Sequence, residues 1–417
     1  MMRPQVVSQA WPAGPASPPL GAARVIAHDL VKRLRNPDLA IPLTIALGAR
    51  LVVMLVATTL LRLVIGERHI GLAGVWDRRD ANWYLAIARY GYNYSPIAES
   101  RANFFPLYPM LIAVFGRLAS AMGLPQPYTM VGMAISWVTF IAAMVALYRL
   151  ALRFFDRRVA MGAVTLLAVF PFSFYYGAVF TESAYLICVA IAFLAVERRN
   201  WWLAAGVSGL ASALRPPGLI LGACVGLAYL ILYLRERRWL RWDLLALALI
   251  PTGGLAYSLY CWIAFGDPLA YVKTSQAGWH EKLQITGIHF AWKLLKSRST
   301  WSIISQPKAW IEPVHLHLTS DIAYMALAFV FLLMIPVVWK QMGPIYAIFL
   351  TVSMMTPVLE FPNLNSLGRY LSVLFPAFFA LAWLLRRWPP LLYGLAALSL
   401  TVLCVYATFF IAGFGLP

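Results

Sequence analysis

The sequence predicts an all-α polytopic membrane protein with about eleven transmembrane helices. Hydrophobic residues make up 61% of the 417 residues, and the mean hydropathy is +0.73. Only 12% of the residues are charged, whereas soluble domains carry about 25%. Long apolar runs alternate with short basic loops, as in helices that cross a bilayer. We therefore expect a cytoplasmic N-terminal tail, residues 1–38, and one integral-membrane domain, residues 39–417.

The predicted spans follow from the apolar runs and the positions of the basic loops. They are residues 39–65, 128–152, 159–176, 184–196, 201–214, 219–234, 244–265, 322–339, 345–359, 371–385 and 391–410. Residues 104–123 are also long enough to cross, but Pro106 and Pro109 break the start of this run and Arg117 interrupts it. If it crossed, the basic loop after residue 152 would lie outside, so we interpret 104–123 as an interfacial helix.

The same reasoning gives the predicted sides of the membrane. The N-terminus lies inside and the C-terminus outside, and two long outer loops cover residues 75–123 and 266–319. The formal charge of +18 is then mainly a topology signal, because every short inner loop is basic. A nucleic-acid partner is not indicated. All four cysteines lie within apolar runs and no HExxH motif is present, so neither a cofactor nor a divalent metal is indicated.

The first outer loop contains two carboxylates, Asp77 and Asp80, in an otherwise largely apolar chain. After Asp80, Trp83, Ile87 and Tyr90 recur at helical spacing, which predicts a short interfacial helix with its aromatic residues at headgroup level. Asp80 then stands at the start of this helix. It is either a functional carboxylate or only an N-cap, a position that aspartate favours.

The predicted topology gathers further polar residues on the outer side. These candidates are Glu182, Arg215, Asp267, Gln276, His280 and Arg369. Charged groups at the ends of spans are costly unless paired or hydrated, and they often mark a substrate path. Each residue alone could be a paired or snorkelling side chain. Their convergence on one side favours a site.

Five sequence blocks resemble the PIG-V-type mannosyltransferases, integral-membrane glycosyltransferases of the GT-C fold. The blocks are DANWYLAIARYGY with NFFPLYPML, FPFSFYYGAVFTES, LAAGVSGLASALRPPGL, FGDPLAYVKTSQAGW and SLGRYLSVLFPAF. They span most of the chain after residue 75, in the family's order. The resemblance implies a polyprenyl-phosphate mannose donor used outside the cytoplasm. It also implies that Asp80 is the catalytic carboxylate. Asp77 is the alternative, because Trp76-Asp77 also mimics the family's Trp-Asp pair.

The chemistry of such a transfer explains the residue types. A carboxylate can take the proton of the acceptor hydroxyl as the new bond forms. The leaving phosphate needs positive charge and no acid, and a guanidinium fork suits its oxygens. We expect Arg369, and next Arg215, to bind the donor phosphate, with inversion by single displacement. Further substrate-binding candidates are Trp83, Tyr84, Glu182, Asp267, Gln276, Trp279, His280 and Tyr370.

Two alternatives remain at this point. A polytopic protein with outer charges could be a transporter or a lipid flippase, although no internal repeat is evident. It could also be a GT-C enzyme that uses another prenyl-phosphate sugar. The acceptor could be a glycan, a lipid or a protein. Arginine outnumbers lysine and no ER-retrieval signal ends the chain, which favours a bacterial plasma membrane over an ER membrane with a luminal site.

Overall fold

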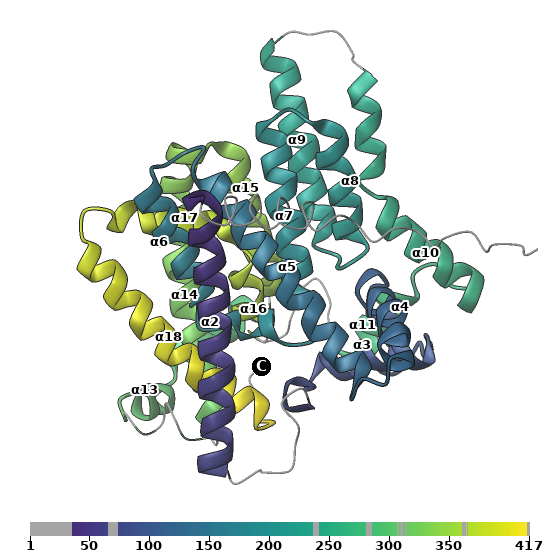
Figure 1. Cartoon of the computed structure of the whole chain (residues 1–417), viewed down its shortest axis with the longest axis horizontal. Coiled ribbons are helices and arrows are strands. Elements are labelled where there is room, and N and C mark those ends of the chain that lie inside the picture. Colours follow the sequence, from purple (N-terminus) through teal and green to yellow (C-terminus); the bar gives the residue numbers. More distant parts are fainter. Residues whose placement is uncertain are drawn as a thin grey trace, which may run out of the picture.

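The computed structural model describes residues 36–65, 74–236, 242–280, 286–306, 308, 312, 315–360, 364 and 366–414. Every element that these residues form is helical, as the sequence predicts (Figure 1). The predicted N-terminal tail lies outside the described residues except for residues 36–38.

The helices occur along the whole described chain. The α-helices are α2 (Pro37–Leu60), α3 (Asp80–Tyr90), α4 (Leu107–Ala121), α5 (Pro127–Ala151), α6 (Arg157–Ala168), α7 (Glu182–Glu197), α8 (Trp201–Ser212), α9 (Gly218–Glu236), α10 (Thr252–Phe265), α11 (Ala270–Gly278), α12 (Thr286–Lys296), α13 (Arg298–Ile304), α14 (Leu316–Met342), α15 (Pro344–Glu360), α16 (Leu367–Ser372), α17 (Phe375–Leu385) and α18 (Pro389–Ile411). Shorter 3₁₀ or π-helical turns are η1 (Leu61–Ile65), η2 (Gly74–Trp76), η3 (Arg101–Asn103), η4 (Ser173–Gly177) and η5 (Trp242–Leu249).

Fewer helices than predicted are long enough to cross a membrane. Among the described residues, five stretches have the length and composition of a span: Pro37–Leu63, Pro127–Ala151, Gly218–Glu236, His317–Met342 and Pro389–Ile411. The pair η5 and α10, bent by 44°, would make a sixth. The predicted count of eleven is not confirmed. Helices α6 and α8 have 12 residues each and are about 18 Å long, whereas a hydrocarbon core is about 30 Å thick.

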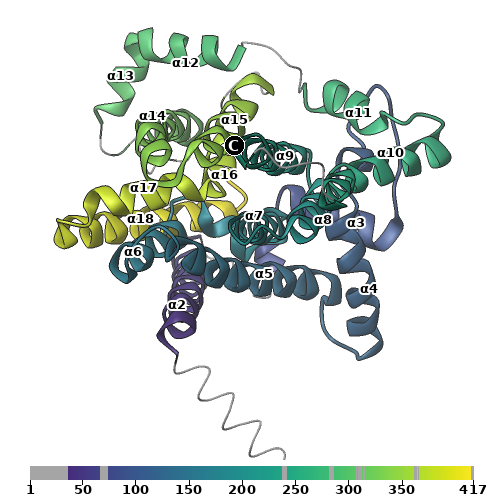
Figure 2. The same cartoon turned by 90° about the horizontal axis from the view of Figure 1, so that it is seen from above.

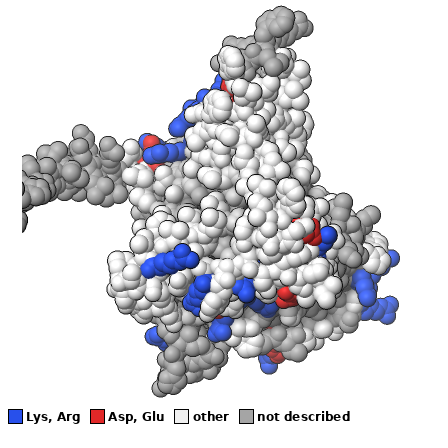
Figure 3. Space-filling view, turned by 90° about the vertical axis from the view of Figure 1, so that its right-hand side faces the viewer, with Lys and Arg blue, Asp and Glu red and all other residues white. Residues whose placement is uncertain are grey.

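The outer surface of the long helices is apolar. Leu55 in α2, Phe329 in α14 and Leu398 in α18 are 60–68% exposed. Figure 3 shows one face on which Lys and Arg gather near two ends, with a broad uncharged area between them. An apolar face of this extent would be unfavourable in water. The chain is therefore an integral membrane protein.

A buried break in the helices separates α6 from α7. Irregular backbone inside a membrane protein must have its polar groups satisfied by other protein groups. Here side-chain donors reach the backbone carbonyls of the break: Ser399 bonds to Val169, Ser183 to Tyr176, Trp137 to Gly177 and Ser136 to Phe180, at 2.8–3.3 Å. These contacts allow the chain to run across the protein interior and to begin α7 at Glu182.

Arg50, in the middle of α2, supports the start of this break. Its side chain is buried, and its guanidinium donates to the carbonyls of Ala168 and Ser173 and to the Ser173 hydroxyl. It also lies 4.9 Å from the ring centroid of Phe140. Ala168 is the last residue of α6, so the cation stands at the negative end of that helix dipole.

Helices α3 and α4 form the predicted pair of short helices between α2 and α5. They pack on each other, and Figures 1 and 2 show them on the same side of the molecule as α10 and α11. The predicted face of α3 is only partly correct, because Ile87 is buried while Tyr90 is 75% exposed. The interfacial position of α4 remains a prediction.

Helix α16, which carries Arg369, is held by a close approach at Gly368. A Cβ atom at this residue would lie 2.4 Å from the ring of Tyr324 in α14 and 2.6 Å from the ring of Phe172. Both rings are buried and contact each other, with centroids 4.7 Å apart. Only glycine lets α16 lie this near to α14 and to the buried break.

We predict that Gly368→Ala destabilises the protein, because the added methyl group must displace two packed rings. Overpacking of this kind costs about 1–3 kcal/mol. The matched control is Gly394→Ala in α18, where no atom lies within 4 Å of the added Cβ and helix propensity favours alanine by about 0.5–1 kcal/mol. Unfolding of both variants in detergent measures the difference. Equal stability of the two variants would contradict the packing argument.

Candidate active site

Four charged side chains from distant parts of the sequence meet in one cluster. Arg369 Nη1 donates to Asp80 Oδ2. Arg369 Nε lies 3.2 Å from Glu182 Oε1, and Arg215 Nη1 donates to the same Glu182 oxygen at 2.7 Å. The charges therefore alternate in the order Asp80, Arg369, Glu182 and Arg215, which we call the charged cluster. The structure brings these four candidate residues into contact with one another.

The four side chains differ in their exposure, and this difference indicates which of them a substrate could reach. Glu182 is 1% exposed and Arg215 is 9% exposed, whereas Arg369 is 15% and Asp80 is 27% exposed. Buried charges need partners, and Glu182 has two arginines. Asp80 is the most accessible member, and Arg369 occupies only one of its two carboxylate oxygens. A substrate hydroxyl could reach the other.

Helix α3 places Asp80 without using it as a cap. The residue before the helix is Arg79, which has the left-handed φ of 58° and makes no side-chain cap bond. Asp80 is the first helical residue, and its side chain pairs with Arg369 across the protein. The reading of Asp80 as a mere N-cap is therefore wrong. A non-glycine residue at positive φ is uncommon and points to a constrained turn at this position.

Aromatic rings surround the two arginines. The Arg215 guanidinium lies 4.8 Å from the ring centroid of Tyr370. The Arg369 guanidinium lies 5.8 Å from Phe180, 5.9 Å from Tyr175 and 6.0 Å from Tyr370. Ring faces attract cations at such distances. Tyr175 and Phe180 were not among the predicted site residues, although they lie in the block that contains Glu182.

Three other predicted aromatic residues form a wall beside the cluster. The Tyr84 hydroxyl lies 3.5 Å from the Thr181 hydroxyl, next to Glu182. Burial, and next the negative charges of Asp80 and Glu182, raise the pKa of Tyr84 above its ordinary value. Trp83 contacts Trp279 with ring centroids 5.6 Å apart. The wall thus joins α3 to the end of α11.

The remaining candidates, from the segment that follows α10, lie apart from the cluster. Asp267 accepts from Tyr94 at 2.8 Å and pairs with Lys273 at 2.6 Å. The hydrogen bond from Lys273, followed by that from Tyr94, lowers the pKa of Asp267. Gln276 and His280 are exposed. None of the three contacts the charged cluster, and Asp267 has a local structural role.

Asp77, the alternative catalytic residue, is also separate from the cluster. Its Oδ2 accepts from Thr129 at 3.4 Å, and its Oδ1 is buried without a hydrogen-bond partner. Burial raises the pKa of Asp77, against the opposing charges of Arg89 and Arg78. The WDRRD doublet therefore contains two carboxylates in different surroundings, of which only Asp80 faces Arg369.

A further buried carboxylate escaped the sequence reasoning. Asp321 is 7% exposed, and its Oδ1 has no hydrogen-bond partner. It lies one turn before Tyr324, which packs against Gly368 next to Arg369. Asp321 directly precedes the predicted span 322–339, and no feature of the sequence assigns it a role. Within the described residues, no three His, Cys, Asp or Glu side chains come together as a metal site would require.

We predict that Glu182→Gln destabilises the protein strongly. The substitution leaves Arg215 and Arg369 without their shared buried counter-charge, and breaking a buried ion pair costs about 3–5 kcal/mol. Glu236→Gln is the matched control, because Glu236 also pairs with an arginine, Arg199, at 2.7 Å but at the surface. There the loss should stay below about 1 kcal/mol. Unfolding in detergent compares the two, and similar losses would show that Glu182 is not an essential counter-charge.

Comparisons with known proteins bear on this site. Residues 57–245 match the sequence profile of the mannosyltransferase (PIG-V) family. No curated protein sequence matches the chain. Solved structures with a similar course include the oligosaccharyltransferase of Archaeoglobus fulgidus in its apo form, at 14% identity and a TM-score of 0.41. Another is the archaeal oligosaccharyltransferase AglB from the same organism, in complex with an inhibitory peptide and a dolichol-phosphate, at 14% identity and a TM-score of 0.42.

These two alignments cover 88% of this chain but 55% of each solved chain, so the protein spans about half the length of those structures. The family match carries more weight, because it includes Asp80, Glu182 and Arg215. The match over residues 57–245 agrees with the resemblance of the sequence blocks to the PIG-V mannosyltransferases.

Proposed function

We propose that the protein moves mannose, or a similar hexose, from a polyprenyl-phosphate sugar to an acceptor hydroxyl on the extracytoplasmic side of a bacterial plasma membrane. The contact between Asp80 and Arg369 is the observation that carries this proposal. It brings one accessible carboxylate, able to accept a proton, next to a cation able to hold a phosphate. A second cation, Arg215, pairs with the buried Glu182, which also contacts Arg369.

The proposed reaction is a single displacement. The acceptor oxygen attacks the anomeric carbon of the sugar as the bond from that carbon to the phosphate oxygen breaks. Asp80 takes the proton of the acceptor hydroxyl, and the leaving group departs as polyprenyl phosphate. Arg369 and Arg215 stabilise the negative charge that develops on it. Only one carboxylate of the cluster, Asp80, is accessible, because Glu182 is buried between two arginines. A single accessible carboxylate beside a cation favours inversion at the anomeric carbon.

Because Asp80 contacts Arg369, binding of the donor phosphate to Arg369 would also release Asp80 for the reaction. A donor phosphate at Arg369 competes with Asp80 for the same guanidinium. When the phosphate binds, Asp80 Oδ2 loses its partner, so that both carboxylate oxygens become available to the acceptor. Glu182 keeps Arg369 in place during this exchange, because it contacts a different guanidinium nitrogen.

The donor's isoprenoid tail requires an apolar path beside the site. A cavity of about 500 Å³ lies between α12, α13, α14, α15 and α16, and its lining is almost wholly apolar. Figure 2 shows α12 and α13 lying alongside α14 and α15 at the edge of the molecule. Leu367 lines the cavity and stands two residues before Arg369 on α16. The cavity is therefore suited to hold a tail whose phosphate reaches Arg369.

The central prediction is that Asp80→Asn abolishes sugar transfer while the protein stays folded. Asparagine keeps the shape of the side chain but has little affinity for a proton, so turnover should fall by about a hundredfold or more. The assay incubates purified protein with labelled polyprenyl-phosphate mannose and cell lipids and identifies the labelled product. Asp77→Asn is the paired control and should retain most activity, because Asp77 contacts Thr129 and not the cluster.

Two results of this experiment would contradict the assignment. An inactive Asp77→Asn protein beside a nearly normal Asp80→Asn protein would move the catalytic role to Asp77. Normal transfer by both variants would show that neither carboxylate is the base of the reaction.

The proposed orientation predicts which surface residues react from outside. The four native cysteines are all buried, so single surface cysteines give a clean signal. Ile97→Cys, at a site 85% exposed in the first loop, should react with a membrane-impermeant maleimide in intact cells. Arg387→Cys, also exposed, should react only after permeabilisation. The reverse pattern would invert the topology and place the charged cluster on the cytoplasmic side.

A further inference from the structure

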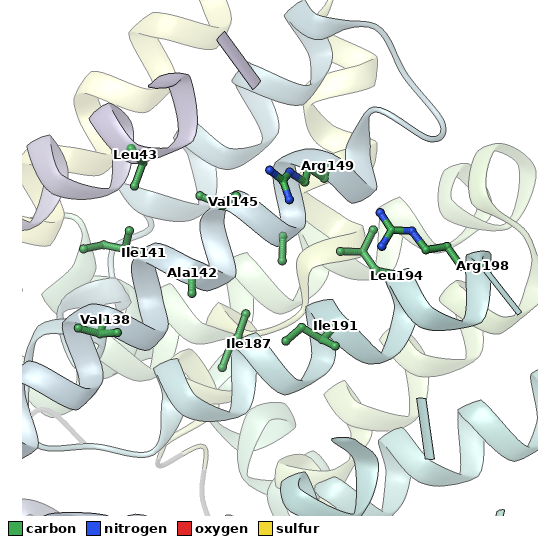
Figure 4. A pocket seen from close by; sticks show the side chains of 11 residues that line it. Leu43, Val138, Ile141, Ala142, Val145, Arg149, Ile187, Ile191, Leu194 and Arg198 are labelled. Atoms are coloured by element: carbon green, nitrogen blue, oxygen red, sulfur yellow. The ribbon is translucent and has the colours of Figure 1, made fainter. Parts of the chain in front are cut away.

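A second groove lies between α2, α5 and α7, away from the charged cluster. Its volume is about 530 Å³, and its walls are aliphatic (Figure 4). The aliphatic lining residues are Leu43 from α2, Val138, Ile141, Ala142, Val145 and Ala146 from α5, and Ile187, Ile191 and Leu194 from α7. Apart from the buried Ala146, the lining residues are half-buried or exposed, so the groove is open to the surroundings of the helices.

Two arginines close one end of this groove. Arg149 lies in the last turn of α5, and Arg198 directly follows α7. Both side chains are exposed, and both point their guanidinium groups towards the same end of the groove (Figure 4). Among the interactions of the described residues, neither arginine takes part in an ion pair or a side-chain hydrogen bond. Two unneutralised cations therefore stand at the mouth of an apolar channel.

The depth of the groove follows from the helices that form it. Near its start, α5 contacts the active-site loop through Thr129 and Asp77, and α7 begins at Glu182 in the cluster. Arg149 lies 20 residues after Thr129, about 30 Å along the helix. The arginines thus stand at the membrane edge opposite the charged cluster. From Val138 to Arg149 the apolar floor is about 17 Å long, close to half of a hydrocarbon core of about 30 Å.

We infer that this groove binds an anionic phospholipid of the leaflet opposite the active site. One acyl chain would lie along the aliphatic walls, and the phosphate would sit between Arg149 and Arg198, whose forks match its oxygens. Phosphatidylglycerol fits because its headgroup carries a net negative charge. Phosphatidylcholine would bring its own cation against the two arginines. Basic pockets between transmembrane helices often hold anionic headgroups.

The inference depends only on the protein spanning a membrane and is independent of the proposed reaction. The groove shares no lining residue with the charged cluster. Basic residues at helix ends also arise as a topology signal, and Arg386 is an example. Its guanidinium stacks on its neighbour Trp383 at 3.9 Å and donates to the Trp383 carbonyl. Arg149 and Arg198 differ from Arg386, because an apolar groove about as long as one leaflet of the bilayer ends between them.

Native mass spectrometry of the full chain, with phosphatidylglycerol and phosphatidylcholine of the same acyl chains, tests the site. The wild type should retain phosphatidylglycerol preferentially. The double variant Arg149→Gln/Arg198→Gln should bind it at least tenfold more weakly, with binding of phosphatidylcholine unchanged. The control Arg158→Gln/Arg387→Gln removes the same charge from two exposed arginines elsewhere and should bind like the wild type. Equal losses in both double variants would mean that only overall charge matters and would overturn the inference.

A second variant tests the groove itself with both arginines in place. Ala142 is exposed and lines the groove, so Ala142→Trp should block the acyl chain without disturbing the core. Retention of phosphatidylglycerol should then fall as it does in the arginine variant. Unchanged retention would refute a lipid in the groove. Preferential displacement of phosphatidylglycerol by undecaprenyl phosphate would assign the groove to a polyprenyl lipid and overturn the proposal as well.

Discussion

Glu182 sits in the interior of a membrane protein with almost no exposure, and a carboxylate in that position has to be neutralised. Two arginines from distant segments meet on one of its oxygens. This arrangement ties the start of α7 to α16 and to the turn after α8. It also fixes the guanidinium that reaches Asp80. The candidate active site therefore extends from a buried ion pair to an accessible carboxylate.

Much of this site could be predicted from the sequence. Apolar runs with basic loops give the helical class, and the outer ends of those runs contain Asp80, Glu182, Arg215 and Arg369. Charged residues beside apolar helices are few, so a small set on one side has few partners other than each other. The same reasoning failed for Asp267, because a local partner, Lys273, lies six residues away on the surface. A nearby lysine satisfies a carboxylate without any role for a distant site.

The number and course of the helices could not be predicted as well. Hydropathy does not distinguish a continuous span from two short helices joined by a buried break, since the residues of the break are themselves apolar. A break is possible only where hydrogen-bond donors reach the backbone carbonyls that the helix no longer pairs. Here the donors belong to residues far away in the sequence: Arg50, Ser136, Trp137 and Ser399. The sequence alone does not show that Arg50 binds the carbonyls of Ala168 and Ser173, more than 100 residues away.

The formal charges in the cluster have a consequence for the proton. Asp80 and Glu182 balance Arg215 and Arg369, so the empty site is formally neutral. Under the proposed reaction, a donor phosphodiester brings one negative charge, whereas the monoester left behind carries about 1.5 to 2 at pH 7. When the monoester is fully ionised, it carries one negative charge more than the donor, and this charge matches the one proton that Asp80 removes from the acceptor. If Asp80 passes it to the departing phosphate, the product leaves as a monoanion and the cluster returns to neutrality. Asp80 then carries a proton from the acceptor to the leaving phosphate, and a turnover exchanges no proton with the surrounding water.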